Sequence, residues 1–158
     1  PWPLAGAVDV AEAWGMAASD GAPLDQQGLE IMSEDECWEK LRQTPIGRIA
    51  FVEAGEPWIL PINHVIVAGR VAFLTAPGTK LSAAMMAEPV GYEVDQYDIE
   101  RRTGWSVLVR GHAEPVYDEA LRRELDASGL VPWATAKPRN HWVHIRPTSV
   151  TGRRLERN

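Results

Sequence analysis

Apolar residues recur at helical spacing in three segments of the chain. The clearest begins at Ser33, because Ser33 and Glu36 have the spacing of a capping box just before an apolar stripe. We expect this helix to end at Thr44, since a residue that precedes proline avoids helical backbone angles. Two shorter helices are expected over residues 79–86 and 118–128, the second with Asp118 as its N-cap.

Elsewhere apolar and polar residues alternate with a period of two, which predicts β-strands. Short turns that contain glycine, at 53–56 and 68–69, join the first strands as hairpins, so we expect an antiparallel sheet. No strand–helix unit repeats along the chain, which argues against a parallel doubly wound fold. We predict a mainly β (α+β) fold, a six-stranded antiparallel barrel, closed or nearly closed, with short flanking helices. The strands are expected over residues 46–52, 57–67, 70–75, 89–95, 104–116 and 141–150.

The two ends of the chain lack this regularity. Residues 1–30 are rich in Ala, Gly, Pro and Asp, with only a ragged helical pattern over 8–18. We expect them to form an extension that either has no fixed position or wraps over a neighbouring surface through Trp2 and Trp14, and residues 31–158 to form the folded domain. Residues 151–158 are expected to be a basic tail.

Composition narrows the class of protein. The chain has 158 residues, enough for one compact core, and a net charge of -6, which disfavours nucleic-acid binding. No apolar run approaches the ~20 residues of a membrane helix, so no membrane partner is expected. Cys37 is the only cysteine, which excludes an intrachain disulfide and indicates a reducing, cytoplasmic location. In an apolar stripe it is favoured as a small buried hydrophobe over a catalytic thiol.

Common catalytic and metal-binding motifs are absent. The sequence contains neither G-x-G-x-x-G nor G-x-x-x-x-G-K-[ST], which removes the main support for Rossmann and P-loop sites. It has no Cys/His cluster with zinc spacing and no G-x-S-x-G elbow. His141 and His144 are expected on opposite faces of one strand, so they are favoured as ordinary strand residues over shared metal ligands. We predict no metal site.

Residues 71–86 carry the most informative pattern, a strand that leads through a tight turn into a helix. The strand delivers Thr75 to the turn, and Gly78 lets the backbone approach a ligand closely. Thr79 and Lys80 then open the helix, where unpaired N–H groups and the helix dipole favour an anion. The segment is either a phosphate site or an ordinary capped helix with a solvent-facing lysine, and local chemistry favours the ordinary helix.

Two further segments are candidates for ligand contact. Pro61 removes a donor from the strand ladder, so residues 60–64 are expected at a sheet edge, where Asn63 either bonds a heterocycle or faces solvent. Trp105 begins a long strand and either stacks on a flat ring or plugs one end of the barrel.

Taken together and in order, six segments resemble the pyridoxamine 5'-phosphate oxidase-like superfamily of flavin-binding split β-barrels. They cover about residues 30–152. The segments are PIGRIAF (45–51), LPIN (60–63), FLTAPGTKL (73–81), VGYEVD (90–95), TGWSVLVRG (103–111) and WVHIRP (142–147).

This resemblance implies a homodimer with two FMN sites, each built from both subunits. By residue, it implies a phosphate contact from Thr75, Ala76, Thr79 and Lys80, an isoalloxazine contact from Ile62, Asn63 and His64, and a contribution from the partner's strand by Trp105 and Ser106.

The chain departs from the true oxidases in two places. They carry a more basic run where this chain has residues 78–80, and an arginine where it has Pro61. The resemblance is therefore to the actinobacterial-type branch, whose members bind FMN or, as the alternative, the deazaflavin F420. It implies a flavin-linked oxidoreductase that transfers hydride at flavin N5 to or from a small-molecule substrate or electron donor. The alternatives are a flavin or deazaflavin carrier of the same fold without turnover, and a cofactor-free structural dimer.

Overall fold

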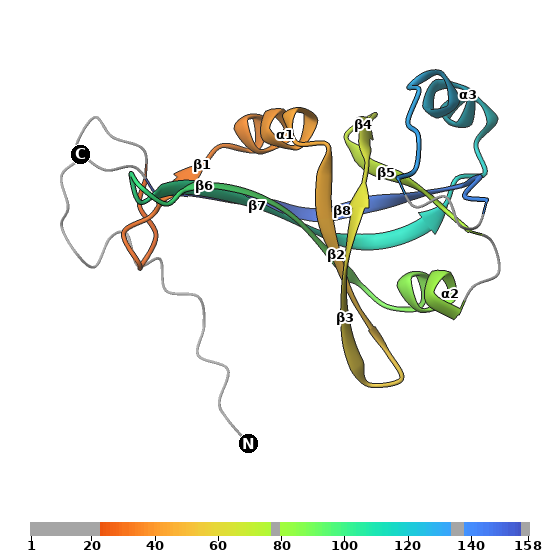
Figure 1. Cartoon of the computed structure of the whole chain (residues 1–158), viewed down its shortest axis with the longest axis horizontal. Coiled ribbons are helices and arrows are strands. Elements are labelled where there is room, and N and C mark those ends of the chain that lie inside the picture. The colour runs from red at the N-terminus through yellow and green to blue at the C-terminus, as the bar shows by residue number, and fades with distance from the viewer. Residues whose placement is uncertain (1–22, 77–79, 134–137, 156–158) are drawn as a thin grey trace.

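The computed structural model describes residues 23–76, 80–133 and 138–155 (Figure 1). The expected helix over 8–18, with Trp2 and Trp14, lies outside these ranges. Within them the chain forms eight strands and three helices. In chain order they are β1 (Glu30–Met32), α1 (Glu34–Gln43), β2 (Ile46–Glu53), β3 (Glu56–Asn63), β4 (Val65–Val67), β5 (Arg70–Thr75), α2 (Lys80–Ala87), β6 (Val90–Asp98), β7 (Thr103–Pro115), α3 (Glu119–Ala127) and β8 (His141–Leu155).

The strands form one antiparallel sheet in the order β3-β2-β6-β7-β8-β5-β4, with β1 paired to β8. β3 and β4 are the two ends of this path, yet only His64 separates them along the chain. The sheet therefore curls until its ends approach each other, and Figure 1 shows β2, β3 and β4 crossing over the long strands β7 and β8. This confirms the predicted fold class, a nearly closed antiparallel split barrel with short flanking helices.

The barrel interior is filled by apolar side chains that alternate along the strands. α1 packs over β8 and β7, and α2 packs against β2 and β7, on opposite sides of the sheet in Figure 1. The largest fully buried side chains are Tyr92, Phe73, Leu41, Ile49, Leu125, Ile145, Val71, Val94, Val107, Val109 and Cys37. Cys37 is thus the buried small residue that its apolar stripe predicts, and burial raises the pKa of its thiol, which disfavours the thiolate a nucleophile needs.

Two helices begin where local chemistry places them. The Ser33 hydroxyl accepts a hydrogen bond from the Glu36 backbone N–H at 3.3 Å, and the Glu36 carboxylate accepts one from the Ser33 backbone N–H at 2.8 Å. At α3 the Asp118 carboxylate accepts from the Leu121 backbone N–H at 2.7 Å. The predicted capping box and N-cap are therefore confirmed. Among the described residues, no helix is long and apolar enough to cross a membrane.

The number of strands is corrected from six to eight within the described ranges. The strand predicted over 57–67 divides at His64, because its two parts belong to opposite ends of the sheet path: β3 pairs with β2, and β4 pairs with β5. The His64 N–H still continues the β2–β3 register, since it donates to the Pro45 carbonyl at 3.2 Å. Asn63 and His64 are the two polar residues in this otherwise apolar stretch, and they stand at the break. Pro61 does lie on the edge strand β3, as predicted.

The prediction of a basic tail is also wrong for residues 151–155. β8 continues through residues 151–155, where it pairs with β7 and with β1, a strand that the sequence pattern does not reveal. The charged residues there are strand residues with partners: Arg153 pairs with Asp25 and Arg154 pairs with Glu30, each at 2.9 Å. Both carboxylates lie more than a hundred positions away from these arginines in the chain. A short window of sequence therefore contains the arginines without their partners, and it resembles a solvated tail.

Candidate functional site

A pocket of about 430 Å³ lies where the end of β3, the start of β2, β5 and the segment after α3 meet. This volume is in the usual range for small-molecule sites, about 300–1,000 Å³. Its lining consists of Ile46, Pro61, Ile62, Asn63, Leu74, Pro132, Trp133 and Arg139. We call it the β3–β5 pocket.

Strand pairing and one hydrogen bond position these side chains. Ile46 and Asn63 are direct partners across β2 and β3, so both stand at the same end of the hairpin. The Asn63 side-chain amide donates to the Val131 carbonyl at 2.8 Å and so ties the segment after α3 to the edge strand. α3 is itself held by the fully buried Leu125 and by a 2.7 Å hydrogen bond from the Trp142 indole N–H to the Asp126 carboxylate on α3.

The chemistry of the β3–β5 pocket suits a flat ligand with one anionic group. Branched apolar side chains form its walls, and Trp133, 71% exposed, stands at the opening. Arg139 is the one charged residue among the described lining residues, and its guanidinium suits phosphate or carboxylate. The Asn63 amide nitrogen is engaged with Val131, which leaves its oxygen as an acceptor towards a ligand.

A second, more open pocket of about 510 Å³ lies at the far end of β6, β7 and β8, beside α1. Its lining consists of Lys40, Gln96, Tyr97, Asp98, Arg101, Thr103, Gly104, Trp105, Arg154 and Leu155. The Lys40 amine lies 4.9 Å from the centre of the Trp105 ring, a cation–π contact. We call it the Trp105 pocket.

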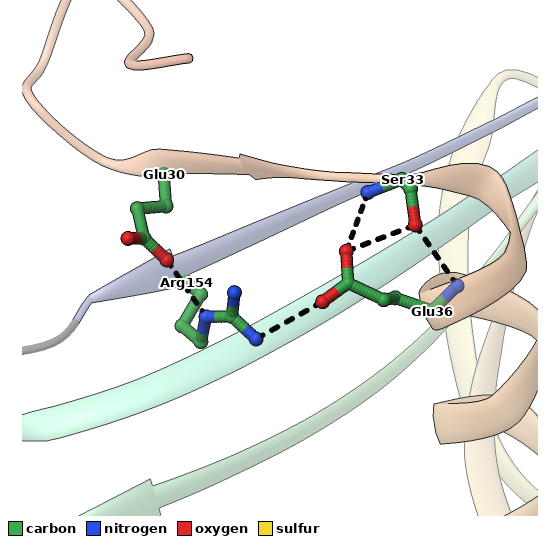
Figure 2. A network of polar contacts seen from close by, with 4 residues as sticks. All are labelled: Glu30, Ser33, Glu36 and Arg154. Atoms are coloured by element: carbon green, nitrogen blue, oxygen red, sulfur yellow. Dashed lines mark hydrogen bonds and ion pairs between the residues drawn. The ribbon is translucent and has the colours of Figure 1, made fainter. Parts of the chain in front are cut away.

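The arginines of the Trp105 pocket are engaged with carboxylates. Figure 2 shows Arg154 between Glu30 and Glu36, at 2.9 Å and 3.3 Å, so that one guanidinium joins β1 and the start of α1 to β8. Arg101 lies 3.7 Å from Asp98. The Trp105 pocket therefore presents an aromatic ring beside arginines that already pair with carboxylates. Arginines paired in this way attract an anionic ligand less strongly than unpaired arginines would.

The structure brings together only some of the predicted site residues. Ile62 and Asn63 line the β3–β5 pocket, and Thr75 and Ala76, both buried, follow its lining residue Leu74. Trp105 lines the other pocket, and no described residue lines both.

The remaining predicted residues lie elsewhere. Ser106 is half-buried next to Trp105, opposite Arg153 of β8, and lines neither pocket. Thr79 lies outside the described residues. Lys80 begins α2, but its side chain lies outside the described part of the chain.

His64 occupies a different environment from its neighbours Ile62 and Asn63. It is 5% exposed, inside the barrel, and both ring nitrogens are engaged: Nε2 lies 2.9 Å from the Leu41 carbonyl oxygen and Nδ1 lies 2.6 Å from the Tyr92 hydroxyl. Burial lowers the pKa of this imidazole. In this structure His64 therefore presents no ring nitrogen to the pocket.

His141 and His144 behave as their strand spacing predicts. His141 is exposed and His144 is buried, so they face opposite sides of β8. Burial and the nearby Arg70 lower the pKa of His144. Across the part of the chain that the structure describes, no cluster of His, Cys, Asp and Glu is arranged to hold a metal ion.

Sequence reasoning missed several lining residues of the β3–β5 pocket. Trp133 and Arg139 lie between α3 and β8, where the sequence pattern predicts neither a helix nor a strand. One signal was present: a large aromatic residue next to Pro132 in a loop is a frequent feature of binding segments. Nothing local, however, indicates that this loop faces β3.

Comparisons with known proteins identify the family of the chain. The sequence model of the family described as pyridoxamine 5'-phosphate oxidase matches residues 33–154. A curated relative, an uncharacterized protein of Mycobacterium tuberculosis, is 38% identical over 140 residues, 85% of this chain and 90% of the relative.

Two solved structures are similar over most of the chain. The FAD binding protein from Mycobacterium smegmatis is 42% identical with a TM-score of 0.68, over 79% of this chain and 97% of that one. A protein from Corynebacterium glutamicum described as a pyridoxamine 5'-phosphate oxidase is 30% identical with a TM-score of 0.68, over 80% of this chain and 98% of that one.

Proposed function

Because the chain belongs to the pyridoxamine 5'-phosphate oxidase family, we propose that it is a flavin-linked oxidoreductase whose cofactor, FMN or FAD, binds at the β3–β5 pocket. The observation that carries the proposal is the meeting of Ile62 and Asn63 with Leu74, which lies one residue before the end of β5. Two segments that are separate in the sequence thus form one apolar pocket. The 42% identical relative from Mycobacterium smegmatis is named for FAD binding, which supports a flavin as the ligand.

The residues of the pocket fit a flavin by their chemistry. The ring system is flat and largely apolar with polar groups along one edge, which matches apolar walls with the Asn63 amide oxygen among them. We assign the phosphate to the connection between Thr75 and α2, with Thr79 and Lys80 as its ligands, since the start of a helix attracts anions. Arg139 adds a positive charge to the lining.

We further propose that the active form is a homodimer in which Trp105 and Ser106 of a second copy complete the site. Two observations support this. Trp105 lines a pocket that shares no described residue with the β3–β5 pocket. The edge hairpin β2–β3 also exposes Val52, Trp58 and Ile59 by 49%, 42% and 66%, an apolar surface of the kind that a second subunit covers.

When bound, the flavin supplies hydride transfer at N5 to or from a small-molecule substrate or electron donor. The chain binds and orients the ring and keeps water away from it through the apolar walls of the pocket. It needs no acid–base dyad for this chemistry. We place the protein in the cytoplasm, because its single cysteine, Cys37, is buried as a free thiol.

A fluorescence titration with FMN, FAD and F420 tests the cofactor and its site. We expect Arg139→Ala and Lys80→Ala each to weaken flavin binding by about tenfold, since each removes a charge near an anion, worth about 1–2 kcal/mol. Arg42→Ala is the matched control, because Arg42 pairs with Glu39 on the exposed face of α1. If the protein takes up none of the three cofactors, the proposal is wrong. Unchanged affinity in Lys80→Ala removes Lys80 from the phosphate site.

The second candidate function is a flavin carrier without turnover, which the name of the Mycobacterium smegmatis relative also fits. Anaerobic reduction of the loaded protein by NADH or NADPH, followed by reoxidation with a small-molecule acceptor, separates the two. An oxidoreductase is expected to cycle through many turnovers. A carrier is expected to hold its flavin in one redox state under the same conditions.

A further inference from the structure

A closed hydrogen-bond network lies in the barrel directly behind the β3–β5 pocket. Tyr92 of β6 is fully buried, and its hydroxyl lies 2.6 Å from Nδ1 of His64, with the two rings in edge-to-face contact at 5.1 Å between centres. On the other side, Nε2 of His64 lies 2.9 Å from the Leu41 carbonyl oxygen at the end of α1.

These partners determine where the protons are. The Leu41 carbonyl can only accept, so Nε2 of His64 must carry a hydrogen and donate it. Nδ1 is then the acceptor and takes its hydrogen bond from the Tyr92 hydroxyl. Burial raises the pKa of Tyr92, which keeps the phenol protonated as this arrangement requires. With a neutral His64, both ring nitrogens and the Tyr92 hydroxyl hydrogen have partners.

A second proton on His64 would break this arrangement. It would sit on Nδ1, so the Tyr92 hydroxyl would have to turn its hydrogen away and could no longer donate to His64. The charge would also be buried, since His64 is 5% exposed.

Several charged groups on the surrounding elements are engaged with other side chains. On β6 and β2, Glu93 pairs with Arg48 at 3.3 Å. On α1, Lys40 lies over Trp105 and Arg42 pairs with Glu39. No carboxylate among these groups is left to compensate an imidazolium.

The network is joined to the pocket through the backbone. His64 directly follows the lining residue Asn63, and Gly47 directly follows the lining residue Ile46. Ile46 and Asn63 are cross-strand partners, and the His64 N–H donates to the carbonyl of Pro45 at 3.2 Å. A displacement of the His64 ring must therefore move the pocket wall and the Asn63 amide that holds Val131.

We infer that His64 is a positioning residue for this pocket: its neutral imidazole, held between Tyr92 and Leu41, keeps Asn63 and Ile46 in the binding arrangement, and its protonation loosens them and weakens ligand binding. The link to a flavin rests on the proposed function. The link from His64 to Asn63 does not, so the two are tested separately.

The first experiment uses the ligand-free protein. In NMR spectra recorded from pH 8 to pH 5, the Asn63 side-chain amide is expected to shift with the same midpoint as the His64 imidazole. In His64→Gln, which keeps a donor for the Leu41 carbonyl and gains no proton, the Asn63 signal is expected to stay constant. His112→Gln is the matched control and should leave the Asn63 titration as in the wild type. An Asn63 amide that does not respond while His64 titrates overturns the inference.

The second experiment measures FMN affinity at pH 8 and pH 5.5. We expect the wild type to lose several-fold more affinity than His64→Gln, up to about tenfold for each unit by which binding lowers the pKa of His64. Titration of the FMN phosphate near pH 6 affects both proteins alike and cancels in this comparison. Equal losses in the two proteins overturn the inference. Absence of flavin binding at pH 8 overturns the proposed function instead, and the NMR result still stands.

A third variant covers the case in which His64→Gln does not fold. Tyr92→Phe removes the hydroxyl that faces Nδ1 and so makes a second proton on His64 easier to accept. The midpoint of the Asn63 shift is then expected to move to higher pH. A midpoint that stays in place or moves to lower pH contradicts the proposed arrangement.

Discussion

Gly47→Ala tests whether the contact between β2 and Tyr92 is as tight as the structure has it. A Cβ added at Gly47 would overlap the phenol oxygen and Cζ of Tyr92 and would lie 2.6 Å from the backbone oxygen of Glu93. Tyr92 has no exposed surface, and Glu93 is held in the β2–β6 ladder opposite Arg48. Neither neighbour can withdraw without moving a paired strand, so the added methyl group must displace packed structure.

The expected cost follows from this geometry. Overpacking a core usually costs about 1–3 kcal/mol, and a methyl group that meets both a buried ring and a backbone oxygen belongs at the upper end. Displacement of Tyr92 also loses its hydrogen bond to His64, a further loss of about 1 kcal/mol. We therefore expect a loss of about 3–4 kcal/mol out of a total stability of about 5–15 kcal/mol.

Urea unfolding followed by circular dichroism measures this loss. A loss of about 3 kcal/mol lowers the urea midpoint by about 1–3 M for m values of about 1–3 kcal/mol/M. Gly91→Ala is the matched control on the facing strand, because its nearest neighbours would be 3.7 Å and 3.9 Å away, at ordinary van der Waals distance. Both variants must be compared at one protein concentration, since association shifts the midpoint. If Gly47→Ala and Gly91→Ala unfold within about 0.5 kcal/mol of each other, the packing argument is refuted.

Three further predictions concern helix capping, core packing and pH. Ser33→Ala removes the α1 cap and should cost about 1 kcal/mol in thermal unfolding; an unchanged Tm contradicts the role of the capping box. Leu125→Ala should lower the free energy of unfolding in urea by about 2–5 kcal/mol, and it should also weaken flavin binding because Leu125 holds α3 and the segment after it. A destabilised variant that still binds flavin with full affinity would show that α3 does not position the site. His64 and His144 have pKa values lowered from 6.5, so the stability they contribute is complete above pH 6.5 and is lost as pH falls below it; urea midpoints that do not drop between pH 7.5 and pH 5.5 refute this.

Local signals predicted much of the secondary structure. The Ser33–Glu36 capping box and the Asp118 cap involve partners three residues apart, so a short window contains all of their chemistry. The edge position of Pro61 also follows from a property of one residue, its missing N–H. Where the relevant partner was distant the prediction was wrong, as for the arginines of β8, whose carboxylates lie on the segment before α1.

The candidate site shows the same difference between features set by neighbouring residues and features set by distant ones. Ile62 and Asn63 were predicted to contact a ligand, and the structure places them on a pocket. His64, the next residue, was predicted with them but turns into the barrel to bond with Tyr92 and Leu41. Alternation along the strand places His64 on the same face as Leu60 and Ile62, which pack against the core, but no local pattern predicts its partners Tyr92 and Leu41.

By itself the sequence determined the fold class and two of the helix starts, because hydrophobic period, caps and turn residues act over a few positions. Only the tertiary structure decided that β3 and β4 are the two ends of one curled sheet, and that the segment after α3 faces β3. It also decided that the β3–β5 pocket and the Trp105 pocket lie apart within one chain. Closing a barrel brings together residues whose contact depends on the packing of the whole core, and no local pattern records which distant surfaces that packing will join.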